Sequence, residues 1–312
     1  MPSFAAKVTR FGFSTLGRIS PDLASRLALA LFCHTPPKRP KAAKARQSFA
    51  DGARKLSTAE RLMLEVRGAK VGLRRIGAPR CSAPRLLVVH GWGSRAEYLA
   101  DLAMGLREAG AEVFVLDLPG HGRSSGRTLD MRMAAEAMAE AQARFGPFDA
   151  AVGHSFGGAA LMAAAGGSFP GVPAFSVQRL AVIGSPSRIE DVFDGFVTMA
   201  GLNPRTARAL VARTERRVGC PVEALDGVAI ARRLGRPLLV VHAEDDKEVG
   251  ADQAKRYLGV SHHIRHHWAN GQGHRRIVSA PEVVATVSNF LVGDDSSGEM
   301  GETVRLRTAS SV

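Results

Sequence analysis

Apolar residues recur in short unbroken runs between residue 60 and residue 292, and these runs alternate with amphipathic stretches. The stretch RLMLEVRGAKVGLRRIG predicts two strands around Gly68. Six further runs predict buried strands at 84–91, 112–122, 148–154, 179–186, 236–246 and 262–269. Stretches with helical period lie at 95–111, 129–146, 156–165 and 279–292. Continuous apolar strands that alternate with helices indicate an α/β fold, with a mostly parallel sheet covered by helices on both faces.

Residues 188–235 interrupt this alternation, because they are helical in pattern and rich in arginine. An insertion between two core strands would lie above the carboxyl ends of the sheet, where ligands bind in open α/β folds. The segment is therefore expected to form a small helical lid. Its apolar positions include Phe193 and Phe196, which we expect to contact substrate. The alternative is that they pack against the body of the protein.

The two ends of the chain differ from this central domain, which spans 57–292. Residues 1–56 contain eleven Lys and Arg against two Asp, a formal charge of +9. Within them 20–33 predicts a short helix, and the proline-rich stretch that follows predicts an extended basic linker. The favoured interpretation is docking onto the rest of the protein; the alternative is weak attachment to an anionic membrane surface. The low apolar content of residues 293–312 predicts a disordered tail.

The composition indicates the compartment in which the protein works and the classes of partner that it can bind. The three cysteines are widely spaced, which argues against a disulfide framework and favours a reducing, cytoplasmic location. No run reaches the ~18–20 apolar residues that cross a bilayer. The excess positive charge lies in the N-terminal segment rather than in the core, so no nucleic-acid partner is expected. The oligomeric state is left open.

The stretch AAVGHSFGGAAL places Ser155 at a G-x-S-x-G spacing between a predicted buried strand and a predicted helix. At such a turn the flanking glycines let strand and helix approach closely, while the serine is held at the apex. A serine hydroxyl needs a base, an acid behind the base and donors for the developing oxyanion. The alternative is a serine in a tight turn without catalytic function.

Five motifs in chain order extend this pattern: VVHGWGS, DLPGHGRSSG, GHSFGG, HAEDDKEV and GQGHRRI. Together, over roughly residues 60–292, they resemble the α/β-hydrolase superfamily, within its small bacterial serine hydrolases. The resemblance implies the α/β-hydrolase fold and a nucleophile, acid and base in the order Ser, Asp, His.

The resemblance also assigns the acid and the base. Its acid turn has a glycine three positions before the acid, and Ala243 occupies that position, which makes Asp246 the matched residue and Asp245 the competitor. His274, in a glycine-rich loop after the last strand, is the expected base. The histidines at 262, 263, 266 and 267 could suggest a metal site, but no carboxylates complete one, and a solvated strand edge is favoured.

Two backbone amides are expected to hold the oxyanion, those of Phe156 and of Trp92. Trp92 is also expected to form an apolar wall for substrate. The resulting expectation is a serine hydrolase for small-molecule acyl esters or thioesters, an esterase of the 3.1.1 type, that works through an acyl-enzyme without metal or organic cofactor. The alternatives are a cofactor-free perhydrolase with the same triad and a non-catalytic protein that uses the pocket for binding.

Overall fold

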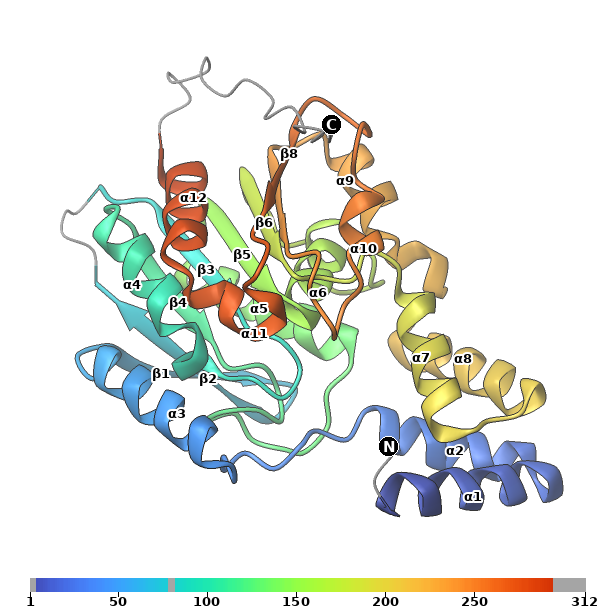
Figure 1. The fold of residues 1–312 in the computed structure, drawn as a ribbon. Coiled ribbons are helices and arrows are strands. Elements are labelled where there is room, and N and C mark those ends of the chain that lie inside the picture. The colour runs from blue at the N-terminus through green and yellow to red at the C-terminus, as the bar shows by residue number, and fades with distance from the viewer. Residues whose placement is uncertain (1–3, 78–81, 294–312) are drawn as a thin grey trace, which may run out of the picture.

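The computed structural model describes residues 4–77 and 82–293 and forms one eight-stranded sheet between layers of helices (Figure 1). The strand order is β1-β2-β4-β3-β5-β6-β7-β8. The strands are β1 Glu60–Val66, β2 Ala69–Ile76, β3 Arg85–Val89, β4 Glu112–Leu116, β5 Ala150–His154, β6 Arg179–Ile183, β7 Leu238–His242 and β8 Ile264–Trp268. The pairs β1–β2 and β2–β4 are antiparallel, and every other pair is parallel. The eight predicted strands and the mostly parallel sheet are confirmed.

The helices are α1 Phe4–Ile19, α2 Pro21–Phe32, α3 Ala43–Lys55, α4 Ala100–Glu108, α5 Met131–Phe145, α6 Phe156–Ala165, α7 Ile189–Ala200, α8 Pro204–Val218, α9 Gly227–Leu234, α10 Asp252–Lys255, α11 Gly273–Arg276 and α12 Pro281–Val292. Short 3₁₀ turns lie at Ala96–Leu99, Val222–Leu225 and Ile277–Ser279. Within the described residues, no helix is both long and apolar enough to cross a membrane.

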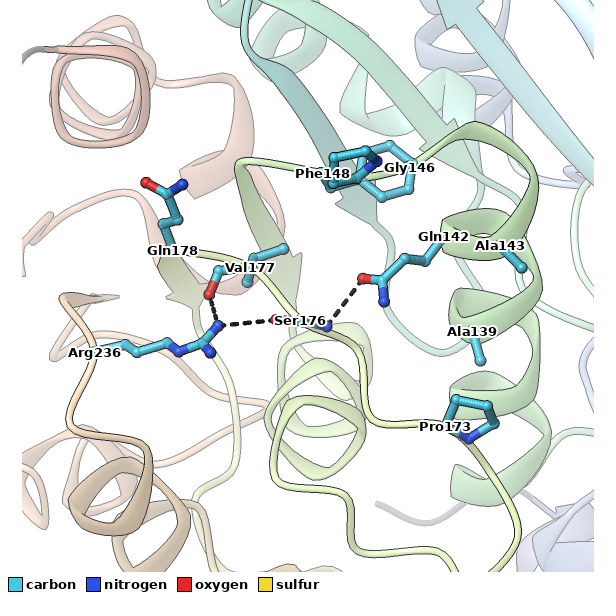
Figure 2. A pocket seen from close by; sticks show the side chains of 11 residues that line it. Ala139, Gln142, Ala143, Gly146, Phe148, Pro173, Ser176, Val177, Gln178 and Arg236 are labelled. Carbon is cyan, nitrogen blue, oxygen red and sulfur yellow. Dashed lines mark hydrogen bonds between the residues drawn. The ribbon is translucent and has the colours of Figure 1, made fainter.

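A cavity of about 740 Å³ lies at the amino ends of the central strands (Figure 2). Phe148, Gln178 and Arg236 line it, and each lies one or two residues before β5, β6 or β7 respectively. Ligands of open α/β sheets bind at the opposite, carboxyl ends. This cavity is therefore separate from the site predicted around Ser155, which follows β5.

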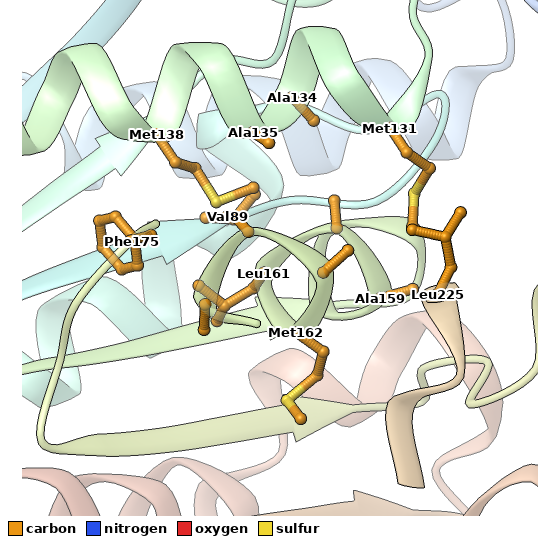
Figure 3. Close-up of a cluster of buried hydrophobic side chains, with 14 of the residues drawn as sticks. Val89, Met131, Ala134, Ala135, Met138, Ala159, Leu161, Met162, Phe175 and Leu225 are labelled. Carbon is orange, nitrogen blue, oxygen red and sulfur yellow. The ribbon is translucent and has the colours of Figure 1, made fainter. Parts of the chain in front are cut away.

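Side chains of alternate residues in each central strand pack into two apolar cores, one on each face of the sheet. Leu87 and Val89 belong to the core beneath α5, α6 and α9, part of which Figure 3 shows. Leu86 and Val88 belong to the core beneath α4 and α12. A strand buried on both faces needs apolar residues at every position, which explains the unbroken runs in the sequence.

Residues 4–56 contain more helix than the sequence indicated. The predicted helix at 20–33 is present as α2, but α3 occupies part of the segment predicted to be extended, and α1 was not predicted. The sequence of α3 is rich in Ala, Lys, Arg and Gln, which all favour helix. It packs closely on the loop before α4, because a Cβ at Gly52 would lie 1.8 Å from the Glu97 carbonyl oxygen.

The 188–235 segment, the predicted lid, divides into two parts. Its last helix, α9, packs on α6. Its first two, α7 and α8, pack on α1 and α2 rather than on the sheet (Figure 1). The helical hairpin of α1 and α2, called the arm below, thus reaches the body of the protein through α7 and α8. The predicted disordered tail, apart from Gly293, lies outside the described residues.

Candidate active site

Ser155 sits at a sharp turn between β5 and α6. Its φ of 54° and ψ of −127° place a non-glycine residue in a strained region of backbone conformation. A hydrogen bond from its backbone N–H to the Ile183 carbonyl, at 2.9 Å, ties the turn to β6. Such strain persists only where the surroundings enforce it, and it points to a functional role for the side chain.

The glycines around Ser155 allow the turn to form. A Cβ at Gly157 would lie 2.3 Å from the His90 carbonyl oxygen, and one at Gly153 would lie 2.5 Å from the Gly158 Cα. Backbone atoms cannot yield as a flexible side chain can. The G-x-S-x-G spacing therefore reflects close contact of β5, α6 and the loop after β3.

Replacing Gly157 by alanine is expected to destabilise the protein by about 1–3 kcal/mol or more, because the new methyl meets two backbone carbonyls. Gly195, exposed in α7 with no atom within 4 Å of a built Cβ, provides the matched control. Gly195→Ala should be neutral or stabilise by up to about 1 kcal/mol. Urea unfolding of both variants checks this, and equal effects would contradict the tight-turn account.

His274 lies between Ser155 and Asp246 and bonds to both. Its Nε2 is 3.0 Å from the Ser155 Oγ, and its Nδ1 is 2.7 Å from the Asp246 Oδ2. In this arrangement Nδ1–H donates to the carboxylate, and Nε2 accepts from the hydroxyl. His274 is 9% exposed and Ser155 half-buried, so the serine is the accessible end of the chain of hydrogen bonds.

Asp246, rather than Asp245, contacts the imidazole. Its Oδ1 accepts from the backbone amides of Glu248 at 2.8 Å and Val249 at 2.9 Å. Burial favours the neutral acid, but the bonds from His274 and these amides outweigh it and hold the pKa of Asp246 below its usual value. Asp245 instead accepts from the Gly271 amide at 2.8 Å and so fixes the loop that carries His274.

The backbone amides of Trp92 and Phe156 have no hydrogen-bond partner among the described residues. Phe156 is the first residue of α6, where a helix leaves its N–H groups free and carries partial positive charge. The loop of Trp92 touches the turn at Ser155, since a Cβ at Gly91 would lie 2.8 Å from the Ser155 Cβ. The rings of Trp92 and Phe156 meet edge to face at 5.7 Å, and Trp92 is 37% exposed beside the turn.

Buried neutral histidines hold the loops of the site in place. His90 Nε2 accepts from the Leu118 amide at 3.0 Å, and His121 Nε2 accepts from the Gly93 amide at 2.9 Å. Burial lowers the pKa of His90 to about 3. Both rings therefore serve the loops through hydrogen bonds that require the uncharged form.

His154 was missed by the sequence analysis. Its Nε2–H donates to the backbone carbonyl of His274 at 2.9 Å, and the two rings lie 4.8 Å apart. Burial, with a smaller effect of His274, lowers its pKa to about 4. Its position directly before Ser155 in the motif was the available signal, but that position does not show that the ring bonds to His274.

The arm covers the two aromatic residues that were expected to contact substrate. Phe193 is 3% exposed, and its ring stacks on Phe32 of α2 at 4.9 Å. Phe196 meets the same ring edge to face at 5.0 Å. The apolar side of α7 thus packs against the arm, a partner that helical periodicity alone does not identify. A role in substrate contact stays a prediction for both residues.

Of the histidines near β8, His263 bonds to its surroundings, whereas the buried Nε2 atoms of His266 and His267 have no hydrogen-bond partner among the described residues. His263 Nδ1 lies 2.6 Å from the Ser261 Oγ, and its Nε2 is 3.3 Å from the Ala231 carbonyl oxygen. In the described part of the chain, no three His, Cys, Asp or Glu side chains are grouped to hold a metal ion.

Comparison with known proteins gives matches to one family model and to many solved structures. The model described as "Alpha/beta hydrolase family" matches residues 86–287. No curated protein matches the chain. Among solved structures, the carboxylesterase CesB of Bacillus subtilis is 19% identical with a TM-score of 0.57, over 80% of this chain and 98% of that one. A membrane phospholipase A, described as a bacterial virulence factor, is 20% identical with a TM-score of 0.56, over 80% and 89%. A thioesterase domain from the curacin biosynthetic pathway is 16% identical with a TM-score of 0.51, over 75% and 99%. At these identities the structural likeness establishes the fold.

Proposed function

The chain belongs to the alpha/beta hydrolase family, and on that premise we propose that it is a serine hydrolase that cleaves carboxylic ester or thioester bonds through an acyl-enzyme on Ser155. The observation that carries the proposal is the hydrogen-bonded series Asp246–His274–Ser155, with spacings of 2.7 and 3.0 Å. These are hydrogen-bonding distances for a base and its nucleophile.

In the first half of the reaction, Ser155 Oγ attacks the acyl carbon while His274 Nε2 takes the hydroxyl proton. The carbonyl oxygen becomes an oxyanion, which the amides of Trp92 and Phe156 stabilise. Asp246 remains ionised and stabilises the imidazolium through Nδ1–H. The intermediate collapses, His274 protonates the departing alcohol or thiol, and the acyl group stays on Ser155.

In the second half, a water molecule replaces the leaving group. His274 removes one proton from the water as its oxygen attacks the acyl carbon, and the same amides hold the second oxyanion. Collapse breaks the bond to Ser155 Oγ, which regains its proton from His274. The products are a carboxylic acid and the free enzyme, with no change in oxidation state.

The surroundings of Ser155 favour an apolar acyl group. Trp92 offers an exposed indole next to the nucleophile, and the ring of Phe156 lies against it. The structural neighbours include a carboxylesterase, a phospholipase A and a thioesterase domain, all of which act on acyl groups. These names support the reaction class without choosing among ester, phospholipid and thioester.

A fluorophosphonate probe tests the mechanism directly, because it phosphonylates only an activated serine. The wild-type protein is expected to be labelled, with the adduct on the peptide that contains Ser155. A panel of esters and matched thioesters, graded from acetyl to long-chain acyl groups, then identifies the substrate class. A folded protein that is neither labelled nor active on the panel would instead be a binding protein that uses the same fold.

A further inference from the structure

Both helices of the arm carry large apolar side chains that are exposed to solvent. On α2, Leu23, Leu27 and Leu31 are 46%, 48% and 41% exposed, and their spacing of four residues aligns them along one side of the helix. On α1, Phe11 and Ile19 are 75% and 77% exposed. We refer to these five side chains as the arm stripe.

The arm stripe remains exposed although both helices already have packing partners. The opposite side of α2 buries Ala24, Ser25 and Ala28, and it lies along α8. Arg213 of α8 donates from Nε to the Ser25 Oγ at 2.8 Å. On α1, the Gly17 carbonyl accepts from the Asn203 side chain at 2.9 Å. The residues of the arm stripe are therefore separate from those that hold the arm on α7 and α8.

The charge around the arm stripe identifies its partner. Arg18 and Arg26 are exposed beside it, while the nearby acid Asp22 is already paired with both Arg26 and Arg213. The arm itself, residues 4–32, contains four Lys and Arg against one Asp, a formal charge of +3. Docking of two copies through this face would bring two such charges together. A nucleic acid would use the charge but leave the apolar stripe unburied.

We propose that the arm stripe docks on an anionic lipid bilayer, with its leucines, Phe11 and Ile19 at the acyl boundary and the arginines at the headgroups. A helix with an apolar face flanked by Lys and Arg binds lipid through apolar burial together with attraction to anionic lipids. The docking does not depend on the proposed hydrolysis, so each can fail without the other.

The segment that connects the arm to the body lies near the carboxyl ends of the strands. Residues 33–38 are bonded to loops there: Thr35 N–H donates to the Arg127 carbonyl at 2.9 Å, and Arg95 Nη1 donates to the Lys38 carbonyl at 2.8 Å. A Cβ at Gly93, next to Trp92, would lie 3.2 Å from Pro36. A docked arm would thus be held through a short bonded segment to the loop beside Ser155.

Co-sedimentation of the full chain with vesicles tests the proposal. The wild type is expected to bind vesicles of phosphatidylcholine with phosphatidylglycerol, to bind phosphatidylcholine alone much less, and to be partly released by high salt. Leu23→Gln/Leu27→Gln should weaken binding about tenfold or more, because the apolar contribution is lost. Leu258→Gln, a matched change of a 50% exposed leucine outside the arm, should bind as the wild type does.

Circular dichroism and thermal unfolding establish that each variant is folded before binding is compared. Failure of the wild type to bind the anionic vesicles would overturn the proposal, as would equal binding by the double variant. A dimer in size-exclusion chromatography that the double variant loses, without any vesicle binding, would assign the stripe to a second copy instead.

Discussion

Replacing Ser155 by alanine is expected to lower kcat for ester hydrolysis by about 10⁴–10⁶-fold, since the residual rate would come only from substrate binding and the oxyanion donors. His274 Nε2 has the Ser155 Oγ at 3.0 Å as its partner. The nearby Ser185 hydroxyl cannot easily take over, because it donates to the Ser155 carbonyl at 2.9 Å. The variant should also lose labelling by the fluorophosphonate probe.

Ser185→Ala is the matched control for this experiment. It removes a hydroxyl close to the same turn, and we expect kcat to stay within about tenfold of the wild type. Steady-state kinetics of both variants, with thermal unfolding to confirm their folds, provides the measurement. If Ser155→Ala keeps a rate near that of the wild type, another group is the nucleophile and the proposed mechanism is wrong.

The sheet was predictable because its strands satisfy a local rule. A central strand such as β3, Arg85–Val89, must be apolar on both faces, and this leaves an unbroken run that periodicity detects. The arm follows no such rule. Its attachment depends on small residues such as Ala24 and Ala28, which allow α2 to lie close to α8, a helix far along the chain. Sequence periodicity identifies an apolar face but does not identify the element that covers it.

In the candidate site, too, some residues were predictable from the sequence and others were not. Ser155 and His274 stand in glycine-rich motifs whose turn chemistry is visible in the sequence, and the structure brings them to hydrogen-bonding distance. His154 could not be distinguished from a packing residue, because its bond to the His274 carbonyl joins segments 120 residues apart. Phe193 lies on an apolar helix face that suggested substrate contact, and the structure supplies Phe32 as a packing partner that the sequence did not indicate. Substrate contact by Phe193 stays a prediction.

The second large effect is expected at Asp246. Replacing it by asparagine should lower kcat strongly, whereas the same change at its neighbour Asp245 should lower kcat little. Asp246→Asn should lower kcat by about 10³–10⁴-fold. The amides of Glu248 and Val249 bond Oδ1 of Asp246, so an asparagine there would keep its oxygen on them and turn its NH₂ toward His274. That donor would favour the imidazole tautomer with the proton on Nε2, which cannot accept the proton of Ser155.

Asp245→Asn removes the same charge one residue earlier, yet its expected loss of kcat is within about tenfold. The single bond that its Oδ1 accepts, from the Gly271 amide, can be kept by an asparagine oxygen. Comparing kcat, KM and thermal unfolding for the two variants separates loss of the acid from loss of negative charge near the site. A greater loss for Asp245→Asn would assign the acid to residue 245, and equal small losses would mean that the imidazole works without a carboxylate partner.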